Sequence, residues 1–280
     1  MAPVDAHTQD RTEVWIRLLR RLTDEQPSWL VLKHPESAFT GSGDIDSAAP
    51  PTSWAAIEST FRSWADEQRL GDVISCPHAP GWLHLVALDP LGGCFYELDV
   101  NQRKLFLGST FYRAEDLLLL AAMDPRGFRR VRPGAEGLLK LILNGTRRGG
   151  RQNPVGLRTK RARELMAADR TGMELASRLF GSARRAIRRG ADACLEGEWD
   201  RGAMIAVELR FLLRAPLEPR GVLWRLWFRV ERRRCPVLRT VFRDHRQPPS
   251  DTRPWLVAVR RNHRVFEGAT SPARRTLDGA

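Results

Sequence analysis

Two aspartates separated by one residue are the part of this sequence whose residue types and spacing most clearly suit chemistry. Asp44 and Asp46 flank Ile45, directly after Gly41-Ser42-Gly43. In an extended strand, residues two apart point to the same face, so the two carboxylates would lie next to each other. Adjacent carboxylates repel unless a cation neutralises them, and a hard cation such as Mg²⁺ suits carboxylate oxygens. The alternative interpretation is a plain acidic loop.

Asp99 is the candidate for a third carboxylate. It lies in an alternating stretch in which Phe95, Glu97 and Asp99 share one face of an expected strand. If this strand pairs with the one that carries Asp44 and Asp46, three carboxylates would meet in a site able to hold two cations. Glu97 is the competing candidate on the same face, and an exposed acid at the end of a strand is the alternative.

Glycines and lysines in the sequence suit an anionic ligand of this site. Gly41, Ser42 and Gly43 would let backbone amides approach a phosphate closely. Lysine is scarce, and two of the four lysines, Lys33 and Lys140, are candidates for phosphate contacts. Lys140 lies in an otherwise apolar helical stretch, so a buried stem would carry its ammonium to a phosphate. A side chain that simply extends to the surface is the alternative.

The elements that must position these residues change character along the chain. Helical spacing of apolar residues predicts helices over 12–22 and 54–70, and a short apolar run predicts a buried strand over 29–33. Alternation between Pro/Gly turns predicts strands over 73–76, 82–88 and 94–100, with a short edge strand at 104–107. Helical patterns then dominate, at 114–123, 134–144, 157–169, 171–189, 201–213 and 222–233.

This order of elements predicts an α/β fold, a mixed sheet with helices followed by a mainly helical C-terminal region. A polar, glycine-containing hinge at 146–151 is the expected boundary. We therefore expect an α/β domain over 1–145 and a helical domain over 152–246. Residues 247–280 are expected to hold a loop, a last strand at 255–259 and a disordered tail.

The composition narrows the class of protein. The chain has 280 residues, 42 % of them hydrophobic, and a net charge of +13 with 42 Arg and only 4 Lys. Wholesale disorder is excluded, and the excess of guanidinium groups favours anionic partners. The four cysteines form no Cys-x-x-Cys pair, so neither a disulfide framework nor a zinc ribbon is expected. No transmembrane segment is expected, because the longest apolar run, 117–123, is too short to span a bilayer. The N-terminus also lacks a secretory pattern, and the two observations together predict a cytoplasmic protein.

Two arginine-rich helical stretches suit a polyanion. The first carries Arg184, Arg185, Arg188 and Arg189, and the second carries Arg225, Arg229, Arg232, Arg233 and Arg234 beside Trp224, Trp227 and Phe228. Basic faces with interleaved aromatic residues can bind nucleic acid or a membrane surface. The alternative is an arginine-covered, solvated face over a tryptophan-rich core.

The order of these segments also carries a resemblance to a known family. An extended stretch at Leu30–Lys33, then Gly43-Asp44-Ile45-Asp46, a helix, and later Glu97-Leu98-Asp99-Val100 resembles the nucleotidyltransferase superfamily that includes DNA polymerase beta. Within it, the chain is similar to a family of uncharacterised bacterial nucleotidyltransferase-like proteins. Phe111–Asp116 and Phe128–Glu136 fit the downstream layout of that family, so the resemblance covers residues 29–145, about half of the chain.

The resemblance implies a polymerase-beta-like mixed sheet and a metal-dependent nucleotidyltransferase. Its cofactor would be Mg²⁺ or Mn²⁺, its substrate a nucleoside triphosphate such as ATP, and its acceptor a hydroxyl group of unknown identity. Asp44 and Asp46 match the paired metal ligands, and Asp99 matches the third acid. Two alternatives stay open: an inactive copy of such an enzyme, and a non-catalytic, arginine-rich module that binds nucleic acid or another polyanion.

Overall fold

The structure is a computed structural model that describes residues 6–41, 43–71, 73–79, 81–89, 94–146, 157–223, 226, 256–257 and 266–267. The chain forms two compact units. The first comprises Met1–Gln102, Asp124–Arg129 and Leu226–Ala280, and the second comprises Arg103–Met123 and Arg130–Arg225.

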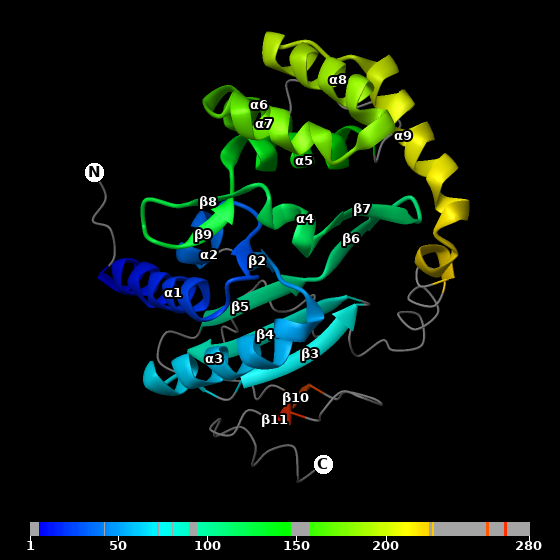
Figure 1. Cartoon of the computed structure of the whole chain (residues 1–280). Coiled ribbons are helices and arrows are strands. Elements are labelled where there is room, and N and C mark those ends of the chain that lie inside the picture. Colours follow the sequence, from blue (N-terminus) through cyan, green and yellow to red (C-terminus); the bar gives the residue numbers. More distant parts are fainter. Residues whose placement is uncertain are drawn as a thin grey trace, which may run out of the picture. The chain divides into compact units, whose positions relative to one another are not determined.

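A mixed sheet of seven strands is the main β element (Figure 1). Its spatial order is β3 (Val73–Ala79), β4 (Trp82–Asp89), β5 (Cys94–Asn101), β2 (Ile45–Ala48), β1 (Leu30–Val31), β9 (Arg129–Val131) and β8 (Ala121–Met123). β2 runs parallel to β5, whereas the pairs β1–β2, β3–β4 and β4–β5 are antiparallel. The expected α/β class with a mixed sheet is therefore confirmed.

The helices of the first unit bury one face of its strands. They are α1 (Ala6–Glu25), the single turn α2 (Glu36–Phe39) and α3 (Trp54–Glu67), which a short 3₁₀ turn, Pro51–Ser53, precedes. Trp15, Leu18 and Leu19 of α1 follow helical spacing and are fully buried. They share a core with Ile57, Phe61 and Trp64 of α3, and the indole rings of Trp15 and Trp64 stack with their centroids 5.8 Å apart.

The second unit is mainly helical. It holds a hairpin of β6 (Arg103–Phe106) and β7 (Ser109–Arg113), then α4 (Ala114–Leu118), β8, α5 (Pro133–Thr146), α6 (Leu157–Ala168), α7 (Arg170–Arg178), α8 (Arg184–Glu196) and α9 (Arg201–Arg214), with 3₁₀ turns at Gly181–Ala183 and Ala215–Leu217. Phe106, Phe111, Phe180 and Phe211 form its aromatic core, with ring centroids 5.2–6.2 Å apart.

Several expected elements differ from the observed ones. The helix expected over 114–123 ends at Leu118, because Ala121–Met123 forms β8 of the sheet instead. The stretch at 171–189 is two helices, since Gly181 adopts a left-handed conformation (φ 48°) that interrupts the helical repeat. The expected strand at 104–107 is β6, which pairs with β7 in a separate two-stranded sheet.

The division into units also differs from the boundary expected at 146–151. Residues 103–123 and 130–145 group with the helices of the second unit, because α5 packs closely against α6 and α7. A Cβ atom on Gly137 of α5 would lie 2.7 Å from the carbonyl oxygen of Ala162 in α6, so this packing requires glycine. Most of the expected hinge lies outside the described residues.

The C-terminal expectations are only partly covered by the described residues. Of the expected strand at 255–259, Leu256–Val257 forms β10, which pairs antiparallel with β11 (Phe266–Glu267). The helix expected over 222–233 and the arginines within it lie mostly outside the described residues. Among the helices that the structure describes, none is both long and apolar enough to cross a bilayer.

Candidate metal centre

The sheet brings the three predicted aspartates together. In the parallel ladder of β2 and β5, Asp46 is the register partner of Asp99. Their neighbours Ile45 and Leu98 are also partners and are fully buried in the core, so Asp46 and Asp99 point to the opposite face of the sheet. Asp44 lies directly before β2, two residues from Asp46. One carboxylate oxygen from each of the three residues lies within 4.8 Å of the others.

Buried polar contacts hold the two strands in this register. The Ser47 hydroxyl donates a hydrogen bond of 2.8 Å to the carbonyl oxygen of Asp99. The Asn101 amide nitrogen donates one of 3.1 Å to the carbonyl oxygen of Ser47. These bonds add to the backbone ladder next to the aspartates. A slip of β2 by one residue against β5 would break them and turn the carboxylates into the core.

Lys33 is the first cation of the site. It follows β1, whose pairing with β2 is extended by a 2.8 Å hydrogen bond from the Leu32 amide to the carbonyl oxygen of Asp46. The Lys33 ammonium forms an ion pair with Oδ2 of Asp46 and lies 3.6 Å from Oδ1 of Asp44. The structure therefore places this predicted phosphate contact at the carboxylates. Its side chain is 38 % exposed, whereas that of Asp46 is 17 % exposed.

His84 is the second cation-forming group, and the sequence interpretation missed it. It is the register partner of Asp99 on β4, and its Nδ1 is hydrogen-bonded to Oδ1 of Asp99. Burial lowers the pKa of His84, but the charge and hydrogen bond of Asp99, with smaller contributions from Glu97 and Asp44, together raise that pKa above its usual value. Apolar and other residues alternate over 82–88, which places His84 on the face of the strand away from Leu83 and Leu85. A prediction of the hairpin register between β4 and β5 would therefore have revealed the His84–Asp99 pair.

The charges and ligand types of this cluster fit a hard divalent cation. Three carboxylates face one lysine and one histidine, so the cluster keeps a net negative charge even with His84 protonated. Carboxylate oxygens are the ligands that Mg²⁺ and Mn²⁺ prefer. Glu97, the competing candidate, is not a member of the three-carboxylate group.

Backbone conformation and close packing explain why positions 41 and 43, before Asp44, are glycine. Gly41 adopts a left-handed conformation with φ 79°, which favours glycine. A Cβ atom on Gly43 would lie 2.8 Å from the Ser37 hydroxyl, so the chain passes close to α2 at this point. Ser42 lies outside the described residues.

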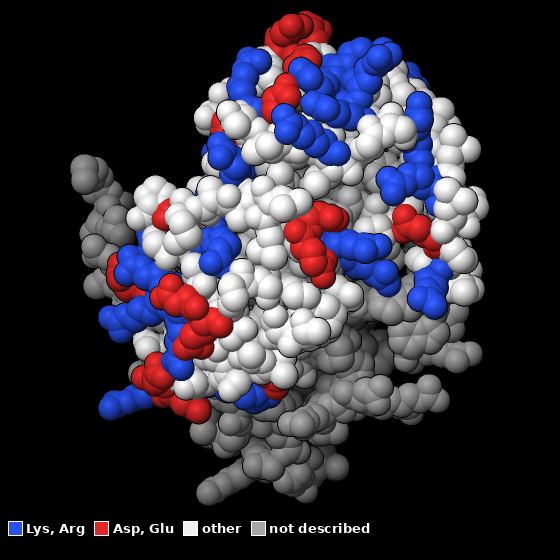
Figure 2. All heavy atoms as spheres, viewed as in Figure 1, with Lys and Arg blue, Asp and Glu red and all other residues white. Residues whose placement is uncertain are grey.

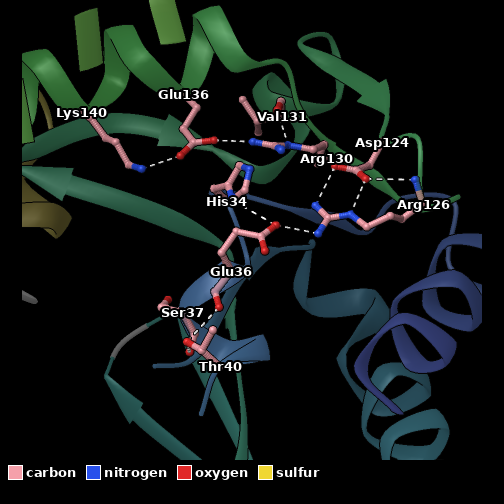
Figure 3. A network of polar contacts seen from close by, with 10 residues as sticks. All are labelled: His34, Glu36, Ser37, Thr40, Asp124, Arg126, Arg130, Val131, Glu136 and Lys140. Carbon is pink, nitrogen blue, oxygen red and sulfur yellow. Dashed lines mark hydrogen bonds and ion pairs between the residues drawn. The ribbon is translucent and has the colours of Figure 1, made fainter. Parts of the chain in front are cut away.

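Lys140 belongs to a partly buried ion network of the second unit (Figure 3). Its ammonium pairs with Oε1 of Glu136, four residues earlier on α5, and Oε2 of Glu136 accepts a 2.5 Å hydrogen bond from Nη2 of Arg130. The structure therefore gives this predicted phosphate contact a carboxylate partner outside the three-aspartate cluster.

Figure 3 also draws polar contacts within the first unit. Arg126 binds both Asp124 and Glu36, and Glu36 also lies 3.4 Å from Nδ1 of His34. The Arg126 guanidinium covers the ring of Phe39 at 5.0 Å from its centroid. These contacts tie α2, which follows Lys33, to the turn at 124–128.

The arginines of α8 lie on a surface rich in basic side chains (Figure 2). Arg184 and Arg188 pair with Glu174, and Arg189 pairs with Asp200 at 2.6 Å. These pairs reduce the positive charge that α8 presents to a polyanion. Of the predicted metal-free cysteines, Cys194 is a buried free thiol, and the side chains of the other three are outside the described part of the chain.

The three carboxylates, with Lys33 and His84 beside them, can bind a cation and an anion at one place. Hard cations bind the carboxylate oxygens, and a phosphate carries charge that suits both the cation and the lysine. Compared with known proteins, the chain matches no family model, no curated protein and no solved structure.

Proposed function

We propose that this chain is a divalent-metal-dependent nucleotidyltransferase that moves a nucleotidyl group from a nucleoside triphosphate to a hydroxyl acceptor. One observation carries the proposal: carboxylate oxygens of Asp44, Asp46 and Asp99 lie within 4.8 Å of one another, with Asp46 and Asp99 on adjacent parallel strands and Asp44 directly before the first of them. The order of β1, the Asp-Ile-Asp segment, α3 and the Asp99 strand also agrees with the order that the resemblance to the nucleotidyltransferase superfamily requires.

Asp44, Asp46 and Asp99 would hold the metal. A bound divalent cation would neutralise phosphate oxygens and polarise the phosphoryl group that is transferred. The donor set fits this task because three ionised carboxylates would repel one another strongly without nearby positive charge. Lys33 supplies part of that charge at Asp46, and His84, when protonated, would supply part at Asp99.

The three aspartates would have different roles in metal binding and in turnover. Asp44 and Asp46 would anchor the metal and, through it, the triphosphate. Asp99 is held in one orientation by His84, and both side chains are buried, 9 % and 6 % exposed. A fixed, buried carboxylate suits the reacting end of the site, where small displacements cost rate more than affinity. Asp99→Asn should therefore lower turnover more than nucleotide affinity.

Calorimetric titration with ATP and GTP, with and without Mg²⁺, tests the proposal. We expect Mg²⁺ to raise nucleotide affinity in the wild type, and Asp44→Asn or Asp46→Asn to remove most of that gain with little change of side-chain volume. Glu97→Gln, on the same strand face as Asp99 but outside the carboxylate group, is the matched control and should keep the gain. The absence of any metal-dependent binding in the wild type would refute the proposal. Salt-sensitive, Mg²⁺-independent binding of nucleic acid would instead favour the arginine-rich module.

A further inference from the structure

Lys33 occupies the same carboxylates that the proposed metal would use. Its ammonium pairs with Asp46 and lies 3.6 Å from Asp44. These two residues are also members of the group that could hold a metal ion. An ammonium and a divalent cation repel each other at such distances, and both compete for the same oxygens. Metal binding at full strength therefore requires Lys33 to leave.

The structure gives Lys33 the freedom to leave without moving the strand. The backbone beside it is fixed, because the Leu32 amide donates to the carbonyl oxygen of Asp46. The side chain is 38 % exposed and ends a flexible four-carbon stem, so rotation about side-chain bonds is enough to carry the ammonium away. A triphosphate beside the carboxylates would offer it an anionic partner of higher charge.

We propose that Lys33 couples metal binding to nucleotide binding. In the nucleotide-free protein its ammonium stands in for the metal at Asp44 and Asp46, and in the nucleotide complex it moves to phosphate oxygens, which leaves both carboxylates to the metal. The inference rests on the proposed function and adds a regulatory step to the same site. Because binding free energies are linked, the nucleotide raises metal affinity and the metal raises nucleotide affinity by the same factor. Lys33 contributes part of that factor.

Direct measurement of Mn²⁺ binding by electron paramagnetic resonance tests this coupling. The proteins are the full-length wild type, Lys33→Met, Lys33→Arg and the control Lys160→Met, which removes an exposed lysine on α6. Without nucleotide, we expect Lys33→Met to bind Mn²⁺ about fivefold more tightly than the wild type, since the competing ion pair is gone. Lys33→Arg keeps a competing cation and should resemble the wild type, as should Lys160→Met.

A second titration, with a non-hydrolysable ATP analogue present, measures the coupling factor itself. We expect the analogue to raise Mn²⁺ affinity by a smaller factor in Lys33→Met than in the wild type. Circular dichroism checks the fold of each variant, and Lys33→Gln, which keeps a polar end group, replaces Lys33→Met if the latter does not fold.

The outcomes separate the coupling from the proposed function. If Mn²⁺ binds the wild type and Lys33→Met equally tightly, and the analogue raises both affinities by the same factor, the coupling is refuted while the metal centre stands. If no protein binds Mn²⁺ with or without the analogue, the metal centre is refuted and the coupling with it.

Discussion

Glu136 offers the sharpest test of the packing in the second unit. Its side chain is 2 % exposed and accepts a hydrogen bond from Arg130, which is 7 % exposed, and it pairs with Lys140, which is 32 % exposed. Glu136→Gln keeps the side-chain volume but removes the negative charge and turns one acceptor oxygen into a donor group. That donor then faces either the guanidinium or the ammonium.

The magnitude follows from the exposure of each partner. Removing one member of a buried ion pair leaves the other charge uncompensated and costs about 3–5 kcal/mol. The Arg130–Glu136 contact is such a buried ion pair, whereas the pair with Lys140 is partly exposed and is worth less than about 1 kcal/mol. We therefore expect Glu136→Gln to lower the free energy of unfolding by about 3 kcal/mol and Lys140→Met by less than about 1 kcal/mol.

Urea unfolding at pH 7, followed by circular dichroism, measures both losses. Arg130→Met combined with Glu136→Leu should recover part of the loss, because a well-packed apolar pair avoids the desolvation cost. Lys140→Met should also leave metal-dependent ATP affinity unchanged, since the ammonium is engaged by Glu136. A loss below about 1 kcal/mol for Glu136→Gln would refute the argument that this pair is shielded from water.

Three further predictions concern pH and close packing. Asp99→Asn removes the charge and the hydrogen bond that outweigh the effect of burial, so the pKa of His84 should fall, and an NMR titration of the imidazole that is unaltered would contradict this. In the wild type, the raised pKa of His84 contributes stability that is complete below about pH 6.5 and is lost as the pH rises through the folded-state pKa. Burial raises the pKa of Asp169, but Arg132 and the amides of Gly172 and Gly134 lower it by more, so the stability that Asp169 contributes is present at neutral pH and is lost as the pH falls through that lowered pKa. In denaturant unfolding, Asp169→Ala should cost about 2 kcal/mol at pH 7, and the cost should shrink as the pH is lowered below about 4. A Cβ atom on Gly134 would lie 1.7 Å from the carbonyl oxygen of Asp169, so Gly134→Ala should lower the free energy of unfolding by about 3 kcal/mol. Gly181→Ala, with open space around its Cβ position, should lower it by about 1 kcal/mol in the same assay.

The acids of the candidate site were predictable because their placement depends on local rules. Strand alternation puts Asp44 beside Asp46 and puts Asp99 opposite Leu98, whatever the strands pair with. The α/β class followed in the same way from the order of helical and alternating segments. These inferences needed only periodicity, whereas the meeting of Asp46 with Asp99 depends on the pairing of β2 with β5, which the resemblance and not the alternation implied.

The partners of these acids were not predictable from periodicity. His84 meets Asp99 only because β4 pairs with β5 in one register, and Lys33 meets Asp46 only because β1 pairs with β2. Both depend on strand pairing between separate segments, which short-range patterns do not encode. Likewise, Ala121–Met123 has helix-compatible residues but forms β8, since pairing within a sheet outweighs a weak local preference.

Paramagnetic broadening by Mn²⁺ tests the central claim, that Asp44, Asp46 and Asp99 hold a divalent cation, most directly. In the presence of a non-hydrolysable ATP analogue, substoichiometric Mn²⁺ should broaden the backbone amide NMR signals of residues 44–47 and 97–100 first, and Asp46→Asn should weaken this broadening. The exposed acids Asp66 and Glu67 of α3 supply the internal control for unspecific binding. Equal broadening at α3 and at β2 and β5, or none at β2 and β5, would contradict the account.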